Sequence, residues 1–229
     1  MVIGNGMIAN AFKQYVDDDK VIIFASGVSN SKETNEEAFK REEDLLRSLD
    51  KSKLLIYFGT CSVNDPTVQR SPYVSHKRCM EYVARYQFKK SIIFRLPIVV
   101  GNTKSQNTFF NYFKEKINSG AEIEVDLLAS RYLIDIEDLS LILSKIIDQY
   151  KDENEIGQKH ITVAFDNKAM VTDIIDMMME ILGKKSIIKL THKGCDYEFD
   201  KKYFSDYLKS INYQLPENYT YNLLKKYLI

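Results

Sequence analysis

Several residue patterns that mark particular protein classes are scarce or missing in this sequence. The three cysteines, Cys61, Cys79 and Cys195, are odd in number, widely spaced and without a zinc-ligand pattern. Lysine plus arginine and aspartate plus glutamate each number 32, so the formal net charge is zero. We therefore expect reduced cysteines, no metal site and no nucleic-acid partner.

Long apolar runs are also missing. No stretch of about twenty apolar residues occurs, which argues against a membrane span. The N-terminus lacks a basic region followed by an apolar segment, as an export signal would have, and Met1 lies so close to the first expected strand that it leaves no room for a leader. These absences predict a cytoplasmic protein whose partners are small molecules and not membranes.

The sequence does contain short apolar segments that alternate with amphipathic ones. An uninterrupted apolar segment such as Ser91 to Leu96 is typical of a strand that a parallel sheet buries on both faces. Strands that alternate with helices predict right-handed crossovers and a parallel sheet. We predict strands at 1–3, 21–25, 53–58, 91–96, 122–125, 131–135, 160–165 and 187–190, and helices at 33–49, 72–86, 108–118, 135–150, 172–182 and 221–228.

These elements predict an α/β protein with helices on both faces of a Rossmann-like sheet. We assign residues 1–101, completed by 131–150, to a cofactor-binding core, and 102–130 together with 151–229 to a smaller α+β substrate lobe. The helix at 33–49 has Phe39, Leu45 and Leu46 on its buried side. Its many carboxylates are most simply interpreted as a solvated face.

A glycine-rich turn follows the first predicted strand. The pattern Gly4-x-Gly6-x-x-Ala9 leads from a strand into a helix that we expect to continue through Val16. Such a turn allows close approach of a pyrophosphate, although a purely structural turn has the same pattern. The small residues Ala25-Ser26-Gly27 end the next strand, where open α/β sheets bind ligands, although an ordinary strand exit is equally consistent with them.

The third predicted strand, at 53–58, leads through Gly59 to Thr60, and the helix after it carries Tyr73 and Lys77. Residues four apart on a helix are neighbours, so the Lys77 ammonium can lie beside the Tyr73 phenol and favour its phenolate. A tyrosine with a lowered pKa is a usable proton acceptor. The same spacing recurs elsewhere without a strand-terminal threonine or a following strand, at Tyr86–Lys90, Tyr112–Lys116, Tyr197–Lys201 and Tyr221–Lys225.

Five segments of the sequence, taken in chain order, resemble those of the extended short-chain dehydrogenase/reductases, the epimerase/dehydratase family that acts on nucleotide sugars. The resemblance covers roughly residues 1 to 150. It rests on the Gly turn, Phe58-Gly-Thr60-Cys-Ser-Val63, Tyr73-x-x-x-Lys77, Arg95-Leu-Pro97-Ile-Val-Val-Gly101 and Arg131-Tyr-Leu-Ile-Asp-Ile-Glu-Asp138.

The resemblance implies hydride exchange between a sugar carbon and the nicotinamide of NAD or NADP. Tyr73 would move the hydroxyl proton, Thr60 would hydrogen-bond the same oxygen, and Lys77 would hold the nicotinamide ribose. Asn107 would meet the nucleotide base and Arg131 the diphosphate. The implied cofactor residues are Gly4, Gly6, Met7, Ile8, Ala25, Ser26, Gly27, Tyr73, Lys77, Pro97 and Val99, and the implied substrate residues are Cys61, Ser62, Asn107 and Arg131.

Departures from the family pattern affect the predicted cofactor and the predicted reaction. Two strand-helix units that would precede Val21 are missing, and so is the acidic residue that would bind the adenosine ribose, which leaves NAD and NADP as alternatives. The family's 4,6-dehydratases have Asp-Glu where this chain has Cys61-Ser62, which disfavours dehydration.

An epimerase or keto-sugar reductase of surface-polysaccharide biosynthesis therefore remains. The alternative is a degenerate, non-catalytic member that binds a nucleotide sugar or a protein. Many family members form homodimers through a four-helix bundle, for which Glu33 to Leu49 and Pro72 to Tyr86 are the candidates here.

Overall fold

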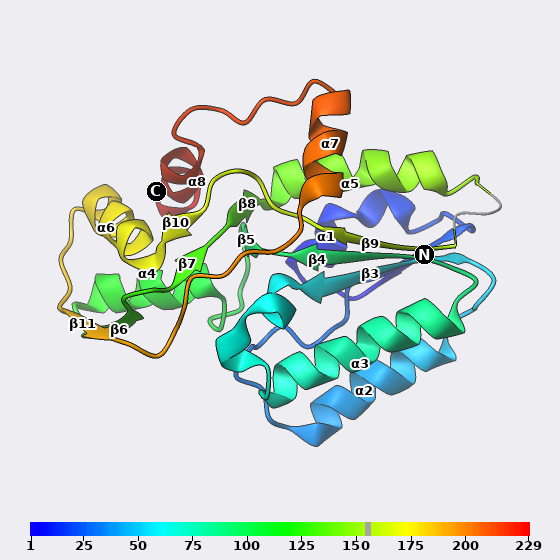
Figure 1. The fold of residues 1–229 in the computed structure, drawn as a ribbon, viewed down its shortest axis with the longest axis horizontal. Helices are drawn as coiled ribbons and strands as arrows, with labels where there is room; N and C mark the ends of the chain where they lie inside the picture. The colour runs from blue at the N-terminus through cyan, green and yellow to red at the C-terminus, as the bar shows by residue number, and fades with distance from the viewer. Residues whose placement is uncertain (154–156) are drawn as a thin grey trace.

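The computed structural model describes residues 1–153 and 157–229. Its main sheet is parallel throughout and has the strand order β1-β2-β3-β4-β9 (Figure 1). The register of β3 with β4 runs from Leu54 opposite Lys90 to Thr60 opposite Leu96. The strands are β1 (Val2–Ile3), β2 (Val21–Phe24), β3 (Leu54–Thr60), β4 (Lys90–Leu96) and β9 (Gln158–Thr162). The predicted parallel sheet is confirmed.

Helices cover both faces of this sheet because successive strand residues point to opposite sides. On β3, Leu55 and Tyr57 join the core formed with α2 (Glu36–Ser48) and α3 (Pro72–Gln87). Ile56 and Phe58 join the larger core on the other face, formed with α5 (Ile136–Tyr150) and, beside α1 (Met7–Ala11), Phe12. In Figure 1, α2 and α3 lie on one side of the sheet, and α1 and α5 lie on the other.

The remaining elements form a second region beside the carboxyl ends of the strands (Figure 1). Its three small sheets pair β5 with β8, β6 with β11, and β7 with β10. Gly120 and Gly183 end α4 and α6 in the left-handed conformation, with φ of 66° and 62°. The elements are β5 (Ile98–Val100), α4 (Phe109–Ser119), β6 (Ile123–Asp126), β7 (Ser130–Arg131), β8 (Leu133–Asp135), β10 (Ala169–Met170), α6 (Val171–Leu182), β11 (Ile188–Thr191), α7 (Lys202–Ser210) and α8 (Tyr219–Leu228).

Some predicted elements differ from the structure. The helix expected to reach Val16 ends at Ala11 and is followed by a 3-10 turn at Lys13–Tyr15. The strand expected at 131–135 is divided into β7 and β8, because its two parts pair with different partners. β9 joins the main sheet although its residues come from the range assigned to the lobe. The polar connector expected after Tyr150 includes 154–156, which are outside the described residues.

Within residues 1–153 and 157–229, no helix is long and apolar enough to cross a membrane. The same residues contain no group of three or more histidine, cysteine, aspartate or glutamate side chains placed to hold a metal ion.

Candidate functional site

Thr60 and Tyr73 meet where β3 passes into α3. The chain leaves Thr60 through two 3-10 turns, Cys61–Asn64 and Pro66–Val68, and enters α3 at Pro72. Ser71 caps the helix by accepting a hydrogen bond from the Val74 amide at 3.2 Å. This cap places Tyr73 in the first turn of α3, facing the end of β3.

Tyr73 is buried, with 7% of its surface exposed. Burial raises the pKa of Tyr73 to about 12; hydrogen bonding with Thr60 lowers it, and the negative charge of Glu42 raises it. We expected the neighbouring Lys77 to lower the pKa of Tyr73. In the structure this pKa is raised, and Lys77 is not among the groups that shift it. At neutral pH the phenol is therefore protonated, and in this state it can donate a proton.

The Lys77 ammonium forms an ion pair with the carboxylate of Glu42, which the sequence analysis did not identify as a site residue. It donates to Glu42 Oε1 at 3.0 Å, to Glu42 Oε2 at 3.3 Å and to the Tyr57 hydroxyl at 3.3 Å. Among the hydrogen bonds of the described residues, none joins Lys77 to Tyr73. Burial lowers the pKa of Lys77, and the Glu42 carboxylate raises it.

Glu42 itself is completely buried, so the interpretation of all α2 carboxylates as a solvated face is wrong at this position. Glu42 accepts hydrogen bonds from the Val28 amide at 2.6 Å and the Tyr57 hydroxyl at 2.8 Å, and His76 Nε2 lies 3.0 Å from it. Burial raises its pKa, but hydrogen bonding with His76 and Val28 and the charge of Lys77 together lower the pKa of Glu42 to about 2. The helical spacing could have revealed the burial of Glu42, because position 42 lies on the same side of the helix as Phe39, Leu45 and Leu46.

The glycine turn leads from β1 into α1 and contacts the residues that follow β2. Gly4 has φ of +123°, and a Cβ there would lie 2.4 Å from the Ala25 carbonyl oxygen, so only glycine fits. Gly6 is exposed, and a Cβ on it would meet no atom within 4 Å, which leaves space above the start of α1. A Cβ on Gly101 would lie 2.7 Å from Met7 Sδ, so Met7 reaches the end of β5. Ile8 is half-buried, as are Ala25, Ser26 and Gly27.

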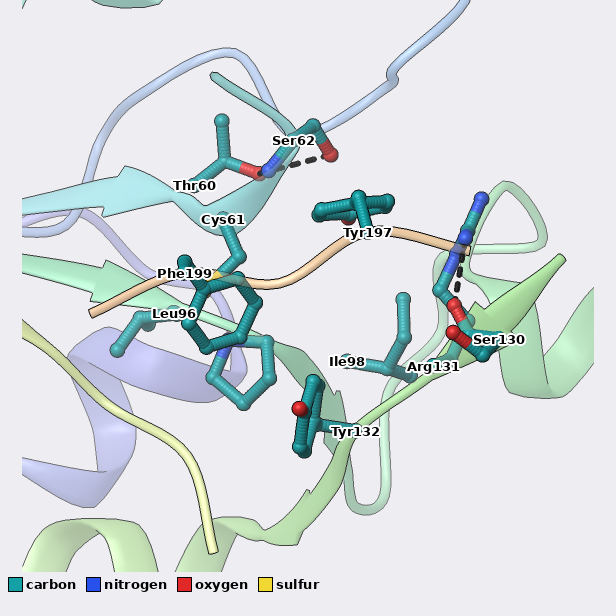
Figure 2. Close-up of a pocket in the computed structure, with 11 residues that line it drawn as sticks. Thr60, Cys61, Ser62, Leu96, Ile98, Ser130, Arg131, Tyr132, Tyr197 and Phe199 are labelled. Atoms are coloured by element: carbon teal, nitrogen blue, oxygen red, sulfur yellow. Dashed lines mark hydrogen bonds between the residues drawn. The ribbon is translucent and has the colours of Figure 1, made fainter. Parts of the chain in front are cut away.

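A small cavity of about 50 Å³ opens beside Thr60 (Figure 2). Five predicted site residues line it, namely Thr60, Cys61, Ser62, Pro97 and Arg131, with Leu96, Ile98, Ser130, Tyr132, Tyr197 and Phe199 completing the lining. Burial raises the pKa of the Cys61 thiol, which therefore stays protonated. Within the described part of the chain, the lining does not include Tyr73, Val99 or Asn107, which is exposed.

Residues 194–199, which we call the crossing segment, pass over this cavity. Figure 2 shows Tyr197 and Phe199 between Thr60 and Ser62 on one side and Arg131 and Tyr132 on the other. Sequence reasoning did not assign Tyr197 or Phe199 to the site.

Polar contacts fix the crossing segment at both ends. Asp196 accepts a hydrogen bond from Ser130 and pairs with Lys168 at 2.6 Å. Glu198 accepts a hydrogen bond from the Tyr132 hydroxyl at 2.9 Å. Arg131 lies over the Tyr197 ring at 5.9 Å and 3.9 Å from the Asp65 carboxylate. The guanidinium predicted to bind a diphosphate is therefore engaged within the protein.

A parallel sheet with helices on both faces, a glycine turn after its first strand and polar residues at the carboxyl ends of its strands is the architecture of dinucleotide-binding proteins. Within that class, the chain belongs to the NAD dependent epimerase/dehydratase family, whose model matches residues 4–164. No curated protein matches the chain.

Solved structures share the fold at low sequence identity. A dTDP-glucose 4,6-dehydratase from Bacillus anthracis in complex with NAD has a TM-score of 0.67 and 15% identity, over 99% of this chain and 78% of that chain. A UDP-galactose 4-epimerase has a TM-score of 0.67 and 16% identity, over 92% and 77%. The Bordetella bronchiseptica enzyme WbmH in complex with NAD+ has a TM-score of 0.67 and 13% identity, over 99% and 80%. This chain is shorter than each of them.

Proposed function

We propose that this chain is an NAD(P)-dependent nucleotide-sugar epimerase or keto-sugar reductase of surface-polysaccharide biosynthesis in the cytoplasm, with Thr60, Tyr73 and Lys77 as its catalytic set. The observation that carries the proposal is the placement of Thr60, at the end of β3, near the buried Tyr73 in the first turn of α3, with Thr60 and Arg131 lining one cavity. A hydroxyl and a phenol on one substrate oxygen are what proton transfer at a sugar carbon requires.

The residues present fit two parts of the family's dinucleotide. Gly6 leaves space above the turn for the pyrophosphate, and Gly4 lets the turn pack against Ala25, with Met7 and Ile8 beside the turn and Ser26 and Gly27 following Ala25. Pro97 and Val99 are half-buried next to the predicted nicotinamide end. The adenosine ribose lacks a partner, because β1 is an edge strand and no described strand beyond it carries a carboxylate.

NAD, when bound, supplies the acceptor or donor of hydride. Tyr73, protonated at neutral pH, donates its proton to a sugar carbonyl oxygen or, as the phenolate, takes the proton of a sugar hydroxyl. Thr60 holds that oxygen, and Cys61 and Ser62 contact the sugar. Arg131 binds the diphosphate after leaving Asp65, and Asn107 meets the base from the exposed surface.

A second candidate is a non-catalytic member of the family. The high pKa of Tyr73 and the engagement of Lys77 by Glu42 favour it. In this reading, the lobe at 102–130 and 151–229 binds a nucleotide sugar or a protein without redox chemistry.

Turnover distinguishes the two candidates. We expect interconversion of a sugar when NAD or NADP and a panel of UDP- and dTDP-sugars are supplied, or oxidation of NADH or NADPH when the corresponding keto-sugars are supplied. Tyr73→Phe should reduce kcat by about 10²- to 10⁴-fold while leaving the melting temperature unchanged. Tyr86→Phe is the matched control, because Tyr86 has the same Lys spacing but is 62% exposed. Equal activity in Tyr73→Phe and Tyr86→Phe would contradict the enzyme assignment.

We also propose a homodimer through α2 and α3, which pack against each other. Tyr82 and Tyr86 are 63% and 62% exposed on α3, with ring centroids 4.4 Å apart, a paired aromatic surface typical of an interface. Light scattering should give twice the chain mass for the wild type and the single mass for Tyr82→Glu. A monomeric wild type would refute the proposal.

A further inference from the structure

The ion pair of Glu42 with Lys77 connects α2 to α3 next to the proposed catalytic tyrosine. Both side chains are almost fully buried, with 0% of Glu42 and 4% of Lys77 exposed. Gly27, at the exit of β2, allows the pair to lie against the backbone, because a Cβ there would be 2.6 Å from Lys77 Nζ and 2.8 Å from Glu42 Oε1. The ammonium is thus enclosed by α2, β3 and the β2 exit.

The two partners are not equally dependent on each other. Glu42 has three further partners, the Val28 amide, the Tyr57 hydroxyl and His76, so its carboxylate stays hydrogen-bonded if the lysine leaves. Lys77 has a flexible four-carbon stem and can turn toward another oxygen acceptor. Buried charges normally resist separation, but here the remaining carboxylate has donors in place.

We propose that Glu42 is a positioning residue that holds Lys77 back from the cofactor cleft, and that dinucleotide binding has to draw Lys77 away from Glu42. The inference rests on the proposed function, because it gives Lys77 a role at the cofactor. Part of the dinucleotide's binding free energy is then spent on releasing the lysine, so removal of the Glu42 charge strengthens binding.

The first test needs no cofactor. The full chain is treated briefly with an amine-acetylating ester, and acetylation of Lys77 is measured by peptide mass spectrometry. We expect Lys77 to be protected in the wild type and to react at least about tenfold faster in Glu42→Gln. Glu42→Asp, which shortens the side chain by one methylene, should give an intermediate rate and decides the question alone if Glu42→Gln does not fold.

The control is Leu46→Ala, which loosens the same buried face of α2 without touching the ion pair. A structural role for Glu42 predicts the same exposure of Lys77 in Leu46→Ala as in the Glu42 variants, and that result would overturn the proposal. Continued protection of Lys77 in folded Glu42→Gln and Glu42→Asp would overturn it as well.

The second test measures NADH and NADPH affinity by fluorescence titration. Glu42→Gln should bind about tenfold more tightly than the wild type. The double variant Glu42→Gln/Lys77→Met should return to wild-type affinity or weaker, since it no longer has an ammonium to offer. A simple loss of packing would weaken binding in both variants. If Lys77 reacts in Glu42→Gln but no variant binds a dinucleotide, then Glu42 does hold Lys77 back and the proposed function is wrong.

Discussion

The strand-to-helix connections after β1 (the glycine end) and after β3 (the tyrosine end), at the carboxyl edge of the main sheet, are built in different ways. At the glycine end, a strand of 2 residues leads into a helix of 5. At the tyrosine end, a strand of 7 residues leads into a helix of 16. The glycine end depends on backbone conformation at Gly4, whereas the tyrosine end depends on buried side-chain hydrogen bonds around Glu42 and Thr60.

In the proposed function, this difference separates cofactor binding at the glycine end from proton transfer at the tyrosine end. The edge position of β1 leaves the adenosine side with few side chains to contribute. The acid/base side has long elements on both faces and can hold polar groups at fixed distances in its interior. The backbone of the glycine turn and the side chains of the tyrosine end should therefore respond differently to substitution.

The largest effect is expected at the glycine end. Gly4→Ala should lower the free energy of unfolding by more than about 3 kcal/mol, because its φ is strained for alanine and its Cβ would overlap the Ala25 carbonyl. Gly6→Ala has open space and should change stability by less than about 1 kcal/mol. Chemical denaturation measures both. A loss for Gly4→Ala as small as that for Gly6→Ala would show that the turn tolerates a side chain at both glycines.

An intermediate effect is expected at the tyrosine end as pH falls. The folded-state pKa of Glu42, about 2, lies below its ordinary value of 4.5, so its contribution to stability is present above 4.5 and lost as pH falls through 2. The stability advantage of the wild type over Glu42→Gln should shrink by about 3 kcal/mol between pH 5 and pH 2. Denaturant titrations across this range measure it.

Glu43→Gln is the matched control on the same helix, since Glu43 forms an exposed i,i+4 ion pair with Arg47. Its stability difference from the wild type should stay nearly constant with pH, because exposed pairs contribute little. A pH-independent difference for Glu42→Gln as well would mean that the carboxylate gains nothing from its buried partners.

The smallest effect concerns Thr60. Thr60→Val removes the hydrogen bond that lowers the pKa of Tyr73, so that pKa should rise further above 12. Sugar oxidation needs the phenolate, so its rate should rise about tenfold per pH unit below the pKa, and Thr60→Val should be about tenfold slower at each pH. Profiles of kcat/KM against pH measure this change.

Ser62→Ala serves as the control for Thr60→Val. Ser62 bonds Thr60 at 3.1 Å but is not among the groups that set the pKa of Tyr73. A Ser62→Ala profile that shifts as far as that of Thr60→Val would assign the effect to the loop or to the sugar contact proposed for Ser62, and not to the contact of Thr60 with Tyr73.

The main sheet and most helices could be predicted from sequence because their apolar periods are local. β5 and β10 were missed because strands of three and two residues have no detectable period. The boundary between β7 and β8 was missed because strand pairing depends on distant residues. The same limit applies to β9, whose place beside β4 is a long-range contact.

The structure brings only some of the predicted site residues together, for a related reason. Thr60 and Tyr73 are close in sequence, and the cap at Ser71 fixes their meeting locally. The partners of Glu42 come from three separate segments, so its burial could not be inferred from the charge pattern of α2. Tyr197 and Phe199 reach the cavity only through the path of the tail.

The crossing segment has a consequence for the time course of ligand binding. A cavity of about 50 Å³ is several times smaller than the roughly 300 Å³ or more that small-molecule sites need, and Tyr197 and Phe199 take up the neighbouring space. In the proposed function, a nucleotide sugar therefore needs residues 194–199 to leave Ser130 and Lys168 before it can enter. In rapid mixing, the observed association rate should then stop increasing at high ligand concentration, at the rate with which the segment lifts.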